Sequence, residues 1–193
     1  AIPVLIEAVK VSPDEPYFLV NLVNIYQQSG KEAEANKLLD DRLAANPQDA
    51  TALLVKGSIL EDKDLKSALG WYYKAAKADP SNTNAFIYLG AGLYNAAAKL
   101  YENSEVTQAT TKMANDLLKA ALPALEIAYK SRPDNIKGIL GSIYYQMDMK
   151  DKREALDAGT LEVGSPTLPD LTDLLQNLDL TVTKKAPAAV EPV

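Results

Sequence analysis

Cysteine and histidine are both absent from this chain of 193 residues. Without cysteine there is no disulfide, no thiolate nucleophile and no cysteine-based zinc site. Without histidine there is neither a Ser-His catalytic pair nor a histidine-ligated metal. Carboxylates, lysines and tyrosines could still carry acid–base chemistry, but the commonest catalytic groups are missing. The composition therefore favours a protein that is not an enzyme and needs no cofactor or metal.

Long apolar runs and basic stretches are lacking as well. No run approaches the roughly 20 apolar residues of a membrane-spanning helix. The formal net charge of -6 argues against a nucleic-acid partner, which would favour a basic surface. No glycine-rich phosphate loop is present, and the first residues do not have the pattern of a signal peptide.

What is present is one spacing that occurs four times: Ala, a large residue four positions on, a small residue three later, and Pro five later. The spacing places the first three residues on one helical face and Pro just after the helix end. Pro13 and Pro47 are 34 positions apart, and Pro47 and Pro80 are 33 apart, which is the length of a two-helix repeat. The four segments are Ala1-Leu5-Ala8-Pro13, Ala35-Leu39-Arg42-Pro47, Ala68-Tyr72-Ala75-Pro80 and Ala121-Leu125-Ala128-Pro133, and only Arg42 is not small.

A second set of amphipathic helices is expected between these segments and after the last. Apolar residues, glycine and tyrosine recur there at helical spacing. They are Leu19, Leu22, Val23 and Tyr26, then Leu53, Gly57 and Leu60, then Phe86, Leu89, Gly90 and Leu93, and finally Leu140, Gly141 and Tyr144.

The combined pattern resembles the tetratricopeptide repeat (TPR) family, whose first helix carries a large apolar residue, Leu-Gly and Tyr, and whose second carries small and aromatic residues before Pro. The best matches are Phe86, Leu89-Gly90 and Leu93 in a first helix, and Ala68, Tyr72, Ala75 and Pro80 in a second. The resemblance implies an all-α fold, a right-handed superhelical α-solenoid of TPR helix hairpins, over residues 1–158.

Proline spacing sets the expected boundaries. We expect a half-repeat at 1–13, repeats at about 14–47, 48–80 and 81–133, and a degenerate repeat at 134–158. Because the half-repeat lacks a first helix, we expect the natural protein to extend upstream; a bare helix that caps the array is the alternative.

One hairpin is expected to be elongated, because Pro80 and Pro133 are 53 positions apart, 19 more than the usual 34. The extra residues, 95–119, contain no Pro or Gly, so both helices of the third hairpin are expected to lengthen into an arm with its tip at 102–104. Beyond this array, a capping helix segment is expected at 159–180, marked by Leu168, Leu171, Leu174, Leu175 and Leu178. Residues 181–193 are rich in Pro and Ala and are expected to be disordered.

The TPR resemblance implies a binding surface, because the first helices of such arrays line a concave face that takes an extended peptide or a helix of a partner. Most residues at the corresponding positions are amides, hydroxyls and phenols, which suit a neutral or weakly charged segment. A solvated surface without a ligand is the alternative. The positions are Tyr17, Val20, Asn24, Gln27, Thr51, Leu54, Ser58, Glu61, Asn84, Ile87, Tyr94 and Tyr145, with Ala91, Asn135 and Ser142 beside them.

These observations predict a non-catalytic scaffold or adaptor for protein–protein interaction, with possible self-association through the open N-terminal repeat. The alternative is a glycan-recognition subunit of a cell-envelope uptake or assembly system, with Trp71 and its tyrosine neighbours as a stacking platform. The segment Ala-Leu-Pro-x-Leu-Glu at 121–126 is also similar to TPR proteins of Bacteroidota, many of them exported. That likeness implies a periplasmic or cell-envelope location, with the cytoplasm as the alternative.

Overall fold

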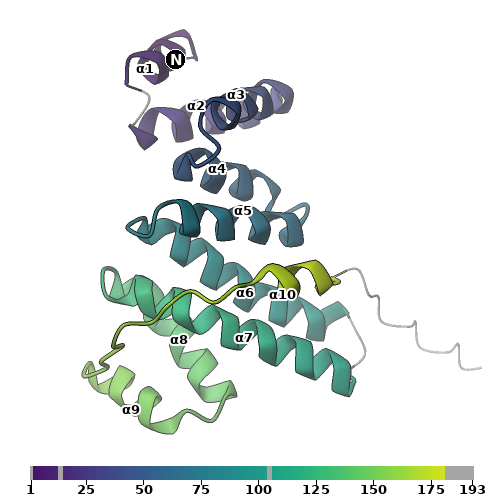
Figure 1. Cartoon of the computed structure of the whole chain (residues 1–193), viewed down its shortest axis with the longest axis vertical. Coiled ribbons are helices and arrows are strands. Elements are labelled where there is room, and N and C mark those ends of the chain that lie inside the picture. The colour runs from purple at the N-terminus through teal and green to yellow at the C-terminus, as the bar shows by residue number, and fades with distance from the viewer. Residues whose placement is uncertain (1, 13–14, 104–105, 181–193) are drawn as a thin grey trace, which may run out of the picture. The chain divides into compact units, whose positions relative to one another are not determined.

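The computed structural model describes residues 2–12, 15–103 and 106–180, and all regular secondary structure in this part of the chain is helical. Within these described residues ten helices, α1 to α10, follow one another (Figure 1). They divide into two compact units, Ala1–Ala85 and Phe86–Val193. The predicted all-α class is confirmed. The predicted disorder of residues 181–193 lies outside the described residues.

Unit 1 contains five helices, and each of them packs against the next along the chain. Their ends follow the proline spacing, because α3 and α5 each stop two residues before a Pro. Gly30, which follows α2, has φ +69°, a conformation that glycine adopts without strain. The helices are α1 (Ile2–Val11), α2 (Pro16–Gln28), α3 (Glu32–Ala45), α4 (Ala50–Leu60) and α5 (Leu65–Ala78).

Acidic side chains cap two of these helices at their N-termini. Asp49 accepts a hydrogen bond from the Ala52 amide at 2.9 Å, and Asp64 accepts one from the Ser67 amide at 3.0 Å. Such bonds satisfy amides that have no partner inside the helix. The hydroxyl of Ser67 also donates to Asp64, at 2.5 Å. Together, the hydroxyl and amide bonds from Ser67 lower the pKa of Asp64.

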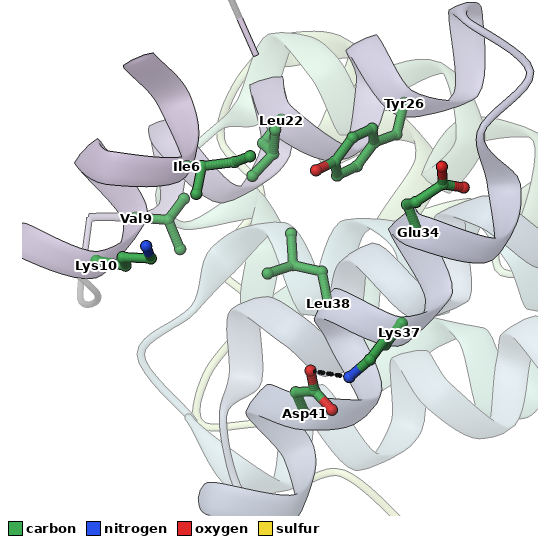
Figure 2. A pocket seen from close by; sticks show the side chains of 9 residues that line it. All are labelled: Ile6, Val9, Lys10, Leu22, Tyr26, Glu34, Lys37, Leu38 and Asp41. Atoms are coloured by element: carbon green, nitrogen blue, oxygen red, sulfur yellow. Dashed lines mark hydrogen bonds and ion pairs between the residues drawn. The ribbon is translucent and has the colours of Figure 1, made fainter. Parts of the chain in front are cut away.

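Helix α1 is less well covered than the other helices of unit 1. None of its residues is buried, and Val4 and Val11 are 72% and 74% exposed. Between α1, α2 and α3 a pocket of about 280 Å³ remains open (Figure 2).

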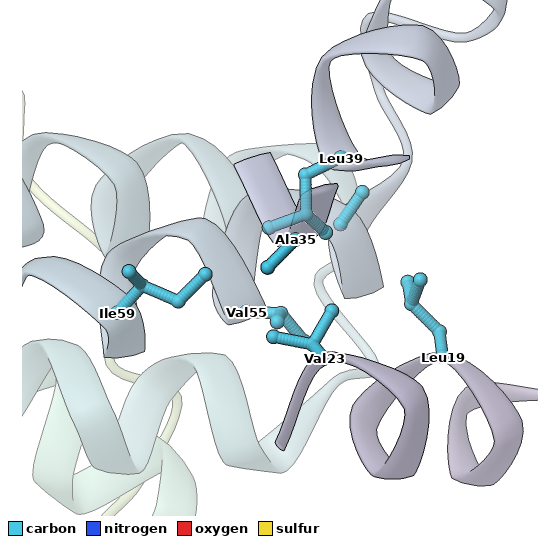
Figure 3. Close-up of a cluster of buried hydrophobic side chains, with 7 residues drawn as sticks. Leu19, Val23, Ala35, Leu39, Val55 and Ile59 are labelled. Atoms are coloured by element: carbon cyan, nitrogen blue, oxygen red, sulfur yellow. The ribbon is translucent and has the colours of Figure 1, made fainter. Parts of the chain in front are cut away.

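The core of unit 1 is built from aliphatic side chains of α2, α3 and α4 (Figure 3). The cluster consists of Leu19, Val23, Ala35, Leu39, Ala52, Val55 and Ile59. A tighter contact joins α4 to α5, where the ring of Tyr72 fills the space above Gly57. A Cβ on Gly57 would come within 3.0 Å of that ring, so the glycine is required for the two helices to approach.

Unit 2 holds the two longest described helices, α6 (Thr83–Asn103) and α7 (Gln108–Tyr129), of 21 and 22 residues; the first three residues of α6 belong to unit 1. The predicted lengthening of both helices is confirmed, and Ser104, expected at the tip, lies outside the described residues. After them come α8 (Pro133–Gln146) and α9 (Lys150–Ala158), and α7 packs on α8 and α8 on α9.

A buried carboxylate joins α7, α8 and α9 in unit 2. Glu126 is 8% exposed and accepts hydrogen bonds from the Tyr144 hydroxyl at 2.9 Å and the Lys152 ammonium at 2.7 Å. Burial, and then the bond to Glu126, raise the pKa of Tyr144. The tyrosine therefore stays neutral and acts as a donor.

The chain after α9 runs back along unit 2 without regular structure as far as α10 (Thr172–Asn177). In Figure 1 this segment leads away from α9 towards α10, which is drawn at the level of α6. The Lys130 ammonium donates to the Gly164 carbonyl and ties the segment to the end of α7. The leucine pattern suggested a longer helix, but Pro166 and Pro169 disfavour helix before residue 170.

Candidate functional site

In unit 1 the predicted concave residues lie on α2 and on α4, with Glu61 directly after α4, and these two helices contact each other. The two predicted stripes are therefore neighbours. Four of the side chains are exposed and the others are half-buried. The exposed ones are Tyr17, Asn24, Gln27 and Ser58, and the half-buried ones are Val20, Thr51, Leu54 and Glu61.

Two of these residues also have internal roles. Val20 packs against the core cluster of unit 1. Glu61, which follows α4, accepts a hydrogen bond from the buried Tyr72 hydroxyl at 2.8 Å. Their contribution to any partner surface is therefore smaller than the sequence pattern suggested. Asn84 is exposed in the first turn of α6, at the end of unit 1.

Trp71, the proposed platform for a sugar, is half-buried and already has partners. The ammonium groups of Lys56 and Lys74 lie 4.8 Å and 4.4 Å from its ring centroid. Lys56 in turn forms an ion pair with Asp40. A ligand that stacks on this ring would have to displace cation–π contacts.

In unit 2, side chains from three helices converge on a pocket of about 240 Å³, which we call the tyrosine pocket. Its lining carries no charged side chain. Helix α6 supplies most of the wall, α7 the buried floor and α8 one amide. The lining residues are Tyr94, Ala97, Ala98, Tyr101, Leu118 and Gln146.

The tyrosine pocket continues the predicted concave stripe of α6. Ile87, Tyr94, Ala98 and Tyr101 follow one another at spacings of 7, 4 and 3 residues, so they share one helical face. On α8, Gln146 lies one turn after Ser142. Tyr101 and Gln146 were not among the predicted surface residues. The same helical spacing reaches Tyr101 two steps after Tyr94 and Gln146 one step after Ser142.

The remaining predicted residues of unit 2 lie near this pocket in the sequence but do not line it. Ile87 is half-buried on α6. Tyr145 on α8 is 71% exposed, and the Arg153 guanidinium lies 4.8 Å from its ring centroid.

The acidic side chains of the described residues do not gather into a site for metal chemistry. No group of three potential ligands is found among them. In the turn at Glu61, Asp62 and Asp64, two of the three have structural partners: Glu61 bonds to Tyr72 and Asp64 caps α5.

The hairpins of unit 1 match a family model described as "Tetratricopeptide repeat", over residues 20–83. This match supports the TPR family. The matched residues begin within α2 and end at the start of α6, so they take in most of the α2–α3 hairpin and the whole α4–α5 hairpin.

Two known human proteins are similar to parts of this chain, one in sequence and one in fold. The human "Protein O-mannosyl-transferase TMTC3" is 29% identical over 105 residues, which cover 53% of this chain and 11% of that protein. A solved structure of a "Human IFIT1 dimer with PPP-AAAA" aligns with a TM-score of 0.58 and 20% identity, over 82% of this chain and 35% of that one. The matched region spans 11% of the first protein and 35% of the second, so each of them extends well beyond it.

The likeness to the IFIT1 structure concerns the fold. Together with the TPR match, it confirms the prediction of an α-solenoid built from helical hairpins. The repeats and the fold point to a protein-interaction scaffold. None of the described helices is both long enough and apolar enough to cross a membrane.

Proposed function

We propose that this chain is a non-catalytic scaffold that binds a peptide or helical segment of a partner protein on the face formed by its first helices. The observation that carries the proposal is the tyrosine pocket. Two successive first helices, α6 and α8, bring Tyr94, Tyr101 and Gln146 to one concave place. Side chains from different helices converge in this way in a binding site, whereas a solvated helix face shows no such concave meeting of side chains.

The size and chemistry of the tyrosine pocket favour a side chain of a partner. Its volume of about 240 Å³ lies below the roughly 300–1,000 Å³ of small-molecule pockets. Because no charge lines the pocket, a charged group bound there would lose its hydration without gaining a counter-charge. We therefore expect an uncharged anchor residue, with the amide and phenols fixing its orientation.

The experiment is site-specific photo-crosslinking in the native host. A benzoylphenylalanine residue in place of Tyr94 or Tyr101 should crosslink to one defined partner protein. The same residue in place of Asn115, exposed on α7 and outside the pocket, is the control. The partner should also be lost from the Tyr101→Ala variant and retained by Tyr88→Ala, which removes a tyrosine of the same helix that does not line the pocket. Equal crosslinking from all three positions would refute the assignment.

Glycan recognition is the alternative function, and Trp71 is the residue at which it can be tested. Glycan recognition is the weaker candidate, because Lys56 and Lys74 already lie over the Trp71 ring. Titration with pooled oligosaccharides should leave Trp71 fluorescence unchanged, whereas a saturable shift would favour the glycan function.

We also propose a periplasmic or cell-envelope location, on the basis of the segment at 121–126, with the cytoplasm as the alternative. Fractionation of native cells with an antibody against this chain decides between the two.

A further inference from the structure

The polar side chains that line the tyrosine pocket can all donate hydrogen bonds. Tyr94 and Tyr101 on α6 carry phenol hydroxyls, and Gln146 on α8 carries an amide. Ala98 and Gln146 are exposed, so the pocket opens to solvent, whereas Leu118 is buried at its floor. A ligand with free carbonyl groups would therefore match the polar groups of the pocket.

The two tyrosines define an interval along α6. They are seven residues apart in the sequence, which corresponds to about 10.5 Å along the helix axis. The α6 side chains between them in the lining are those of Ala97 and Ala98, and these are small enough to leave space beside each ring. A bound segment can therefore contact both rings if its own side chains repeat at a similar interval.

A segment in the polyproline II conformation has such an interval. With three residues per turn and a rise of about 3.1 Å per residue, prolines at positions i and i+3 lie on one side and about 9.3 Å apart. This differs by only about 1 Å from the separation of Tyr94 and Tyr101 along α6. Grooves lined by aromatic side chains bind proline-rich segments in this conformation. Two prolines of one segment can therefore pack on the two tyrosine rings.

The backbone of a polyproline II segment also suits the donors of the pocket. The segment has no internal hydrogen bonds and proline has no N–H, so the carbonyl oxygens of the segment are free to accept. The Gln146 amide and the phenols can donate to them. A helical segment uses most of its carbonyls internally, and its diameter of about 10–12 Å is large for a pocket of about 240 Å³.

We propose that the tyrosine pocket binds a proline-rich segment of another protein, held in the polyproline II conformation by two prolines three positions apart. This inference rests on the proposed function, because it names the kind of segment that the scaffold takes. No charged side chain lines the pocket, so the residues of the segment that face it are uncharged. Such a segment is already extended before it binds, which lowers the entropic cost of binding in a small site.

A second copy of this chain is a poorer occupant, although its Pro166 and Pro169 have the same spacing. These prolines lie between α9 and α10, on the segment that the bond from Lys130 to Gly164 ties to the end of α7. Asp170 directly follows the second proline. Its carboxylate would be brought to a pocket that offers no cation, at a cost in hydration.

The probe is a fluorescent peptide of about twelve residues, or four turns of polyproline II. It carries Pro at positions i, i+3 and i+6, with Ala and Ser elsewhere. A second peptide has Ala in place of each Pro, and a third is a neutral helical peptide with Leu at positions i, i+3, i+4 and i+7. Fluorescence anisotropy measures binding to the full chain, and amide chemical shifts locate the site.

We expect the proline peptide to bind and to shift the amides of Tyr94, Tyr101 and Gln146. The alanine peptide should bind at least about tenfold more weakly, because it must be ordered on binding.

Variants of the lining residues test the contacts one by one. Tyr101→Ala should weaken binding of the proline peptide at least about tenfold, because an aromatic anchor is lost. Tyr101→Phe keeps the ring, and Gln146→Ala changes an exposed side chain, so both variants should fold normally. Each of them should weaken binding about fivefold through the loss of one hydrogen bond. Tyr88→Ala, on the same helix but outside the pocket, should change binding by less than about twofold.

Four results would overturn the inference. One is no binding of the proline peptide up to about 1 mM. Another is equal binding of the alanine peptide, or equal losses in Gln146→Ala and Tyr88→Ala. The third is tighter binding of the helical peptide at the tyrosine pocket. The fourth is self-association of the chain that Pro166→Ala abolishes, which would make a second copy the occupant.

These failures are distinguishable from a failure of the proposed function. A defined partner that crosslinks from Tyr94 and Tyr101 through a segment without proline would overturn only the proline-rich ligand. Equal crosslinking from the pocket and from Asn115 would overturn the concave-face function itself.

Discussion

Units 1 and 2 are built from the same kind of hairpin but are held together by different interactions. In unit 1, ion pairs connect neighbouring helices: Lys63 binds Glu32 at 2.8 Å on the exposed surface, and Arg42 binds Asp49 in a largely covered pair whose side chains are 17% and 12% exposed. In unit 2, the buried carboxylate of Glu126 connects α7, α8 and α9 instead.

The difference indicates which charged side chains can be removed from each unit without a large loss of stability. An exposed ion pair contributes little, because water replaces either partner. Removing a buried carboxylate leaves its buried hydrogen-bond donors without an acceptor, which lowers the free energy of unfolding much more. The exposed Lys63–Glu32 pair of unit 1 should therefore tolerate the removal of a charge, whereas the buried Glu126 of unit 2 should not.

The largest expected effect is at Glu126. Glu126→Ala should lower the free energy of unfolding by about 3 kcal/mol, because the buried Tyr144 hydroxyl would lose its acceptor and Lys152 its counter-charge. Lys152 can turn to water, as its side chain is 41% exposed, which keeps the loss below the upper end of the range for buried pairs. Guanidinium denaturation with helix-resolved hydrogen exchange measures it.

The matched change in unit 1 is Glu32→Ala, which removes an ion pair whose side chains are 56% and 60% exposed. Its cost should be under about 1 kcal/mol. Similar losses in the two variants would mean that the contrast between the units is wrong.

Glycines at equivalent positions of the hairpins give the next largest effect. A Cβ on Gly57 or Gly90 would come within 3.0 Å of Tyr72 or Leu125, whereas one on Gly141 would lie 3.6 Å from Leu156. Gly57→Ala and Gly90→Ala should therefore each cost about 1–3 kcal/mol, measured by thermal and chemical unfolding.

Gly141→Ala is the control for this series. It should be neutral or stabilise unit 2 by up to about 1 kcal/mol, since Ala favours helix and the contact is ordinary. Destabilisation by Gly141→Ala as large as that by Gly90→Ala would show that a tight approach is also needed between α8 and α9.

The smallest effect concerns the starts of the helices and depends on pH. Asp64 caps α5 with a carboxylate, and its pKa is lowered by the bonds from Ser67, whereas the hydroxyl of Thr107 caps α7. A lowered folded-state pKa means that the stabilisation is present above the unfolded-state value of about 4 and is lost as the pH falls through the folded-state value. Acid should therefore weaken the start of α5 and leave the start of α7 unchanged, as seen in amide chemical shifts between pH 7 and pH 2.

Two variants of Asp64 sharpen this pH prediction. Asp64→Ala should cost about 1 kcal/mol at neutral pH. Asp64→Asn should retain the cap and abolish the acid effect, because the amide oxygen still accepts but does not titrate. Acid sensitivity that persists in Asp64→Asn would assign the effect to another group.

The helices themselves were predictable because their signals are local. Proline spacing marked the ends of α3 and α5, and the absence of Pro and Gly in residues 95–119 marked the length of α6 and α7. Apolar spacing identified most of the core, including Leu19, Leu89 and Leu140. Arg42, which broke the small-residue rule, is explained by its bond to Asp49.

The contacts between helices were not predictable, because they depend on which side chains meet. Glu126 stands between Leu125 and Ile127 with no local sign of burial, and its ammonium partner lies 26 residues later. The ring of Trp71 on α5 is partly covered by the side chain of Lys56, which lies on the preceding helix, α4. Likewise, Gln146 joins Tyr94 and Tyr101 only when α6 and α8 are placed together.

The return of the chain after α9 has a consequence for the kinetics of folding. Hairpins close between neighbours in the sequence, but the Lys130–Gly164 contact spans 34 residues, and such non-local contacts slow folding. The segment from residue 160 to α10 can dock only after α7 exists. This segment should therefore be the last part of unit 2 to form during folding.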